Sequence, residues 1–189
     1  MKGKDLLLPV LCSIMDMIAV IGAGRHSGKT TAVEALVREL KKRGLKVGTI
    51  KQIHEQDFSI DKRGKDSWRH VGAGADVVVT ASPAEVAAIK RIPGKDRFQE
   101  AVMLLDGQNL DIVIVEGHPG ISVPMVYAAR GEGATKAKPI DDNVICIVSL
   151  TPENFHESRL PVYHIIKESP RIADLVLKKL EKGERGAGE

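Results

Sequence analysis

The residues with the clearest chemical potential lie in a short glycine-rich segment near the start of the sequence. Residues 23–30 read Ala-Gly-Arg-His-Ser-Gly-Lys-Thr, which has the length of a Walker A phosphate-binding loop. The glycines allow backbone N–H groups to face phosphate oxygens, Lys29 can reach the β- and γ-phosphates, and the Thr30 hydroxyl can bind Mg²⁺. We expect a nucleoside triphosphate to contact Gly24, Arg25, His26, Ser27, Gly28, Lys29, Thr30 and Thr31.

This loop departs from the usual pattern at its first position. The pattern begins with glycine, whereas this sequence has Ala23 there and Gly22 one residue earlier. Alanine is small enough that we expect the loop to form. The alternative is a glycine-rich turn whose lysine is merely exposed, and the apolar strand pattern before it and helical pattern after it favour the phosphate loop.

A carboxylate at the end of an apolar segment is the second candidate for a residue of the nucleotide site. Residues 111–116 read Asp-Ile-Val-Ile-Val-Glu, so a predicted strand ends at Glu116 and Gly117 closes it. An acidic residue at a strand end is usually only solvated. Beside a phosphate loop, however, it is where a Walker B carboxylate would support Mg²⁺ or its water ligand. We therefore predict Thr30 and Glu116 as the metal-side residues.

Apolar runs and helical periodicities alternate along the chain, and these elements must position the two motifs. We expect strands over residues 17–22, 46–51, 76–80, 86–92, 110–116, 124–129, 144–150 and 161–166, and helices over 28–43, 65–71, 97–105 and 170–182. Alternation of this kind predicts an α/β fold, a doubly wound, mostly parallel sheet with helices on both faces. The stretch 89–129 can add an antiparallel pair at one edge.

Length and composition fit one nucleotide-binding domain. The 189 residues predict a domain over 17–182, an N-terminal extension over 1–16 and a disordered tail over 183–189, with Met15 or Met17 as alternative start sites. The net charge of +3 comes from interleaved charges rather than a basic stripe, so we expect no nucleic acid partner. The apolar run 6–15 is too short to span a bilayer, and the isolated Cys12 and Cys146 fit a reducing cytoplasm.

Chemically capable groups are also dense in residues 51–67, after the second predicted strand. The carboxyl end of a strand beside a phosphate loop is where sheets of this class bind ligands. Position therefore makes this loop a candidate part of the site, although any surface loop is polar. The candidates are Lys51, His54, Asp61, Lys65 and Asp66.

These motifs together resemble those of the MobB family, the molybdopterin-guanine dinucleotide biosynthesis proteins B. The resemblance spans about residues 17–180, and the polar-loop motifs are more specific than a phosphate loop alone. It rests on Ser27-Gly-Lys-Thr-Thr31, Ile50-Lys51 followed by His54, Asp61-Lys62 with Gly64-Lys65-Asp66-Ser67, Ala73-Gly-Ala75 and Val115-Glu116-Gly117. It implies a GTP-binding, usually dimeric partner of the guanylyltransferase that attaches GMP to molybdopterin, with slow GTP hydrolysis at most.

The resemblance also implies roles for the matched residues. Lys29 and Thr30 would hold phosphate and Mg²⁺, and Glu116 would support the metal. The polar-loop residues would line the triphosphate site, with Asp61 or Asp66 as a metal-side or water-orienting carboxylate. For His54, a hydrogen-bonding surface histidine is an equally good interpretation.

Two departures from the family bear on the nucleotide contacts: the one after Glu116-Gly117 affects a basic contact, and the one at Ser149-Leu150 leaves the guanine contact open. His118-Pro119 follows Glu116-Gly117 where the family commonly has Phe-Lys, and Ser149-Leu150 stands where it tends to have Ser-Asp. We expect GTP with Mg²⁺, and ATP remains an alternative. Direct binding of molybdopterin is also open. The competing function is that of a P-loop kinase or ligase, which transfers phosphoryl from ATP or GTP to a small acceptor.

Overall fold

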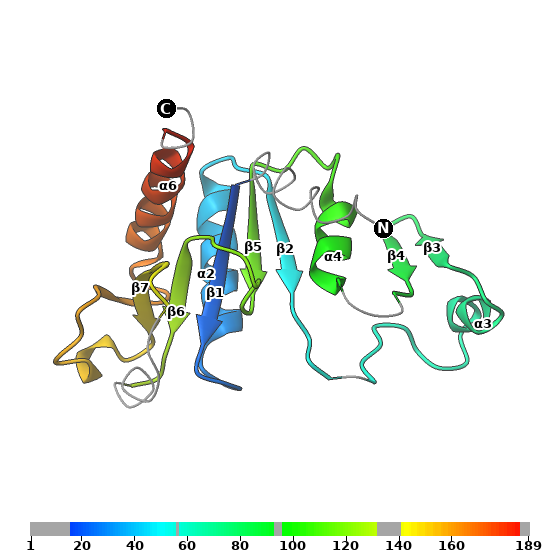
Figure 1. The fold of residues 1–189 in the computed structure, drawn as a ribbon, viewed down its shortest axis with the longest axis horizontal. Helices are drawn as coiled ribbons and strands as arrows, with labels where there is room; N and C mark the ends of the chain where they lie inside the picture. The colour runs from blue at the N-terminus through cyan, green and yellow to red at the C-terminus, as the bar shows by residue number, and fades with distance from the viewer. Residues whose placement is uncertain (1–15, 56, 93–95, 132–140, 186–189) are drawn as a thin grey trace. The chain divides into compact units, whose positions relative to one another are not determined.

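The computed structural model describes residues 16–55, 57–92, 96–131 and 141–185 (Figure 1). The chain divides into two compact units. The first unit combines the residues up to Gln52 with those from Ala101 onward, and the second unit is Ile53–Glu100. Among the described residues, no helix is long and apolar enough to cross a membrane.

The first unit is built on a six-stranded sheet in which every strand pairing is parallel. This confirms the predicted parallel α/β architecture. The strand order is β2 (Val47–Lys51), β5 (Ile112–Glu116), β1 (Asp16–Gly22), β6 (Met125–Ala128), β7 (Val144–Ser149) and β8 (Val162–His164). Valine and isoleucine dominate the central strands because these strands are buried, as is typical of parallel sheets.

Two helices pack on this sheet and form its main core. They are α2 (Lys29–Lys42) and α6 (Ser169–Arg185), which lie side by side in Figure 1. The core includes Leu36 and Leu40 of α2 and Val176 of α6. Arg43, just past α2, donates to the Asp174 carboxylate at 2.7 Å, and this ion pair joins the two helices. The short 3₁₀ helix η1 (Pro152–Asn154) lies between β7 and β8.

The second unit contains the antiparallel strands. β3 (Val77–Ala81) pairs with β4 (Val86–Lys90), and α3 (Asp66–Gly72) precedes them. α4 (Arg97–Leu105) runs from this unit into the first. The antiparallel pair expected over 89–129 is therefore misplaced, because β5 and β6 in that stretch join the parallel sheet and the pair forms its own small sheet.

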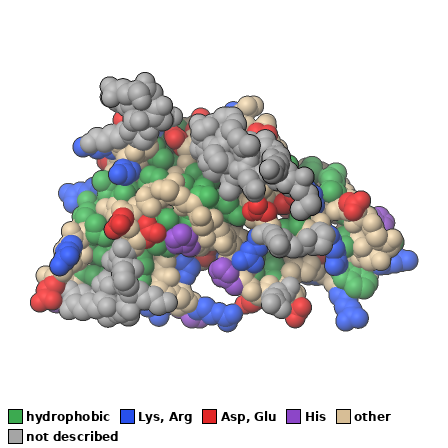
Figure 2. Space-filling model, in the orientation of Figure 1, with side chains coloured by type: hydrophobic (Ala, Val, Ile, Leu, Met, Phe, Trp, Pro, Cys, Tyr) green, Lys and Arg blue, Asp and Glu red, His purple; other side chains and the backbone are tan. Residues whose placement is uncertain are grey.

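Charged side chains of both signs are interspersed on the face seen in Figure 2. The described part of the chain begins at Asp16, the first residue of β1, and ends at Arg185, the last residue of α6. The rest of the expected N-terminal extension and residues 186–189 fall outside the described part.

Candidate functional site

The phosphate loop connects the end of β1 to the start of α2, as its pattern predicts. Gly24 and Gly28 have φ values of +149° and +98°, which side chains disfavour. A Cβ on Gly22 would come within 2.5 Å of the Ala128 carbonyl oxygen and of Ser27 Oγ. Ala23 is exposed and has a negative φ, so its side chain meets neither restriction. The position next to the first turn that has no room for a side chain is therefore Gly22 and not Ala23, which explains how the loop accommodates an alanine there.

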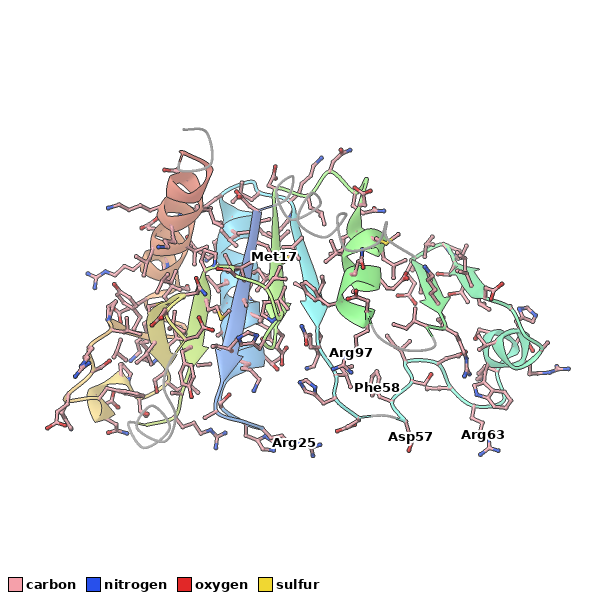
Figure 3. All side chains as sticks on the ribbon, viewed as in Figure 1. Met17, Arg25, Asp57, Phe58, Arg63 and Arg97 are labelled. Carbon is pink, nitrogen blue, oxygen red and sulfur yellow. The ribbon has the colours of Figure 1, made fainter. Side chains whose placement is uncertain are left out.

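Lys29 is held inside the loop by the loop itself. Its ammonium donates to the Gly24 carbonyl and, at 3.2 Å, to Ser27 Oγ. Ser27 is buried, whereas Arg25 and His26 are exposed at the turn. Figure 3 shows Arg25 extending beyond the end of β1. The Lys29 ammonium thus occupies the concave side of the loop, where phosphate oxygens can replace its present acceptors.

Thr30, in the first turn of α2, meets Glu116 and Lys51, the last residues of β5 and β2. Thr30 Oγ1 donates to Glu116 Oε1 at 2.8 Å, and Lys51 Nζ lies 3.3 Å from the same oxygen. The sheet produces this meeting because β5 lies between β1 and β2, with Glu116 opposite Val20 on one side and Lys51 on the other. The side chain of Glu116 is only 12% exposed.

These donors fit a magnesium ion. Mg²⁺ in nucleotide sites is held by one or two protein oxygens together with phosphates and water, and it does not need a protein cage. The Thr30 hydroxyl and Glu116 carboxylate supply two such oxygens. No group of three or more His, Cys, Asp or Glu side chains able to hold a metal occurs among the described residues. The two oxygens suit a Mg²⁺ ion whose remaining ligands are phosphate oxygens and water.

Four of the predicted site residues lie in the second unit: His54, Asp61, Lys65 and Asp66. Asp61 organises the loop before α3, since its Oδ1 accepts the Lys62 N–H at 2.8 Å and the Ser67 hydroxyl at 2.9 Å. Its Oδ2 is buried and lacks a hydrogen-bond partner. Asp66, at the start of α3, is 89% exposed and lies 3.7 Å from Arg69. Lys65 immediately precedes that helix and is exposed.

His54 is fixed by an arginine that sequence reasoning missed. Arg97 Nη1 donates to the Ile53 carbonyl at 3.1 Å, and its Nη2 lies 3.3 Å from His54 Nδ1. The two partners are 43 positions apart, so no local spacing predicts the pair. Figure 3 labels Arg97 at the start of α4. The contact matches the interpretation of His54 as a hydrogen-bonding histidine.

The loop after Glu116 is internally bonded. His118 Nδ1 accepts the Gly120 N–H at 3.1 Å, and its Nε2 lies 3.4 Å from Asp141 Oδ2. Hydrogen bonds from the backbone and side chain of Asn143, and then from His118, lower the pKa of Asp141. Both ring nitrogens of His118 therefore contact residues of this part of the first unit.

The edge that follows β7 has an apolar character. Ser149 is buried and its Oγ accepts the Thr151 N–H at 3.1 Å, while Leu150 is 51% exposed. Ile165, just past β8, lies against the phosphate loop, because a Cβ on Gly28 would be 3.3 Å from its Cδ1. Leu150 thus presents an aliphatic side chain where the family commonly has a carboxylate.

Comparison with known proteins agrees with these motifs. The family model "Molybdopterin guanine dinucleotide synthesis protein B" (MobB) matches residues 17–150. Two relatives are both named "Molybdopterin-guanine dinucleotide biosynthesis adapter protein". The Haemophilus influenzae protein is 31% identical over 150 residues, which cover 79% of this chain and 82% of that protein. The Escherichia coli protein is 30% identical over 186 residues, which cover 96% and 98%.

A solved structure supports the same assignment. The crystal structure of Bacillus subtilis MobB has a TM-score of 0.69 and 26% identity, covering 87% of this chain and 98% of that one. The predicted resemblance and the predicted fold are both confirmed. The chain belongs to the MobB family of molybdopterin-guanine dinucleotide synthesis proteins.

Proposed function

We propose that this protein is an adapter in molybdopterin-guanine dinucleotide synthesis that binds GTP and Mg²⁺ at the phosphate loop. The observation that carries the proposal is the hydrogen bond between Thr30 and Glu116, which brings the two predicted metal-side residues together. The names of the relatives supply the adapter role and the guanine-containing product of the pathway, and GTP as the ligand rests on the family resemblance.

Lys29 and the loop backbone bind the phosphates in this proposal. The N–H groups around Gly24 and Gly28 and the amino end of α2 attract negative charge. Lys29 exchanges its contacts with Gly24 and Ser27 for β- and γ-phosphate oxygens. Thr30 and Glu116 would hold Mg²⁺, which neutralises phosphate charge when bound.

Slow hydrolysis follows from how the carboxylates are used. Glu116 accepts a hydrogen bond from the Thr30 hydroxyl and forms an ion pair with Lys51. Asp61 accepts hydrogen bonds from the Lys62 N–H and the Ser67 hydroxyl. Neither is arranged as a free general base for water. The family resemblance implies Asp61 or Asp66 as the water-orienting carboxylate, and this role stays a prediction. An adapter with weak GTPase activity fits these hydrogen bonds and this ion pair better than a kinase or ligase does.

The partners proposed are the guanylyltransferase, molybdopterin itself and a second copy of the chain, all in the cytoplasm. The homodimer has support in the second unit. β3 and β4 form a sheet of only two strands, which is marginal alone in water. Val77, Val79 and Val86 are 47%, 61% and 71% exposed on one face of it, and covering this face would stabilise both copies.

Calorimetric titration with Mg²⁺–GTP and Mg²⁺–ATP tests the proposal. We expect GTP to bind, and Lys29→Ala to weaken it by at least about tenfold because a charged phosphate contact is lost. Lys41→Ala removes an exposed charge from the last turn of α2 and serves as the matched control. Failure of GTP to bind, or indifference to Lys29, would contradict phosphate binding. Rapid acceptor-dependent turnover would contradict the adapter role.

A further inference from the structure

Lys51 places a second lysine beside the carboxylate of the candidate site. It is the last residue of β2, directly opposite Glu116 in the parallel register. Its ammonium lies 3.3 Å from Glu116 Oε1, the same atom that accepts the Thr30 hydroxyl. Lys29, by contrast, contacts only loop atoms, Gly24 O and Ser27 Oγ, among the contacts seen for its ammonium. The two lysines therefore act on different groups.

A positive charge beside Glu116 is favourable in this environment. The Glu116 side chain is only 12% exposed, so water and salt screen its negative charge less than they would at the surface. It also borders the place proposed for a highly negative triphosphate, which it would repel. Lys51, 58% exposed, keeps its ammonium hydrated while it neutralises Glu116. Mg²⁺ would supply that positive charge to the same carboxylate.

We propose that Lys51 is the counter-ion of Glu116 in the metal-free site and gives up this role when Mg²⁺ binds with the nucleotide. This inference rests on the proposed nucleotide binding. Lys51 is a positioning residue in it: its ion pair with Glu116 Oε1 keeps that carboxylate aligned with Thr30, so the two metal-side oxygens are already together before Mg²⁺ binds. The main consequence is that Lys51 matters most when Mg²⁺ is absent.

The test is GTP affinity in Mg²⁺ and in EDTA, for the wild type and Lys51→Met. In EDTA, we expect Lys51→Met to weaken binding by about tenfold, because Glu116 then repels the triphosphate unopposed. In Mg²⁺ the loss shrinks to about twofold or less. Lys51→Arg keeps the charge and should retain the affinity in EDTA. Lys46→Met removes the same charge just before β2 and should change neither value.

Coupling to Glu116 provides the second measurement. In a Glu116→Gln background, Lys51→Met should lose its effect in EDTA, because there is no carboxylate left to neutralise. An equal loss in Mg²⁺ and EDTA would overturn the proposal in favour of a direct phosphate contact. No loss in either condition would overturn it as well. If the wild type bound no GTP in Mg²⁺, the nucleotide-binding proposal would fail first, and this inference with it.

Discussion

The hydroxyl of Thr30 donates a 2.8 Å hydrogen bond to Glu116, across 86 positions of sequence. One residue belongs to the first turn of α2 and the other ends β5. Because β5 lies beside β1 in the sheet, the phosphate loop that follows β1 is brought next to this carboxylate. The phosphate loop and a carboxylate that was a weak signal alone thus lie side by side, with oxygen donors suited to Mg²⁺.

Replacing Thr30 with valine tests this relationship. Valine keeps the shape of threonine but cannot donate to Glu116 or bind a metal. We expect Thr30→Val to lose most of the gain in GTP affinity that Mg²⁺ provides, which we place at about tenfold. Calorimetry with and without Mg²⁺ measures it. Thr49→Val, an exposed threonine of β2, is the control. An unchanged Mg²⁺ effect in Thr30→Val would remove Thr30 from the metal site.

Gly22 should be the least replaceable glycine of the phosphate loop for steric reasons. In Gly22→Ala, the new Cβ would lie 2.5 Å from both Ala128 O and Ser27 Oγ, so β6 or the loop must shift. We expect a loss of about 1–3 kcal/mol in the free energy of unfolding, together with weaker GTP binding. Gly72→Ala, which meets nothing within 4 Å, is the control. Equal stability of the two variants in urea would contradict the close approach.

The sequence predicted those features whose signal is local. The phosphate loop has fixed spacing, and the apolar run before Glu116 marks a buried strand, so both were found. Register and strand order are tertiary, and they alone place Lys51 opposite Glu116. The contact between Arg97 and His54 was missed for the same reason. The separate β3–β4 sheet was missed because strand periodicity does not say which strands pair.

The thiol of Cys146 should not react with thiol reagents in the folded protein. Burial within β7 raises the pKa of its thiol to about 12, whereas an exposed thiol titrates near 8.5. The folded state therefore holds this proton more tightly than the unfolded state. Its contribution to stability is present below about pH 8.5 and is lost as pH rises toward 12. In a Cys12→Ser variant, which leaves Cys146 as the single thiol, a disulfide reagent at pH 8 should react only after unfolding. Rapid reaction of the native protein would contradict the burial.

Val79 tests the proposed homodimer. It is 61% exposed on the β3–β4 face that also carries Val77 and Val86, so a lysine there would place a charge in an apolar contact between two copies. We expect Val79→Lys to shift the protein from dimer to monomer in sedimentation, with the fold retained because the side chain already faces solvent. Thr80→Lys, on the opposite face of the same strand, is the matched control and should remain dimeric. If both variants stay dimeric, the two copies meet elsewhere. If the wild type is itself a monomer at micromolar concentration, the homodimer proposal is wrong.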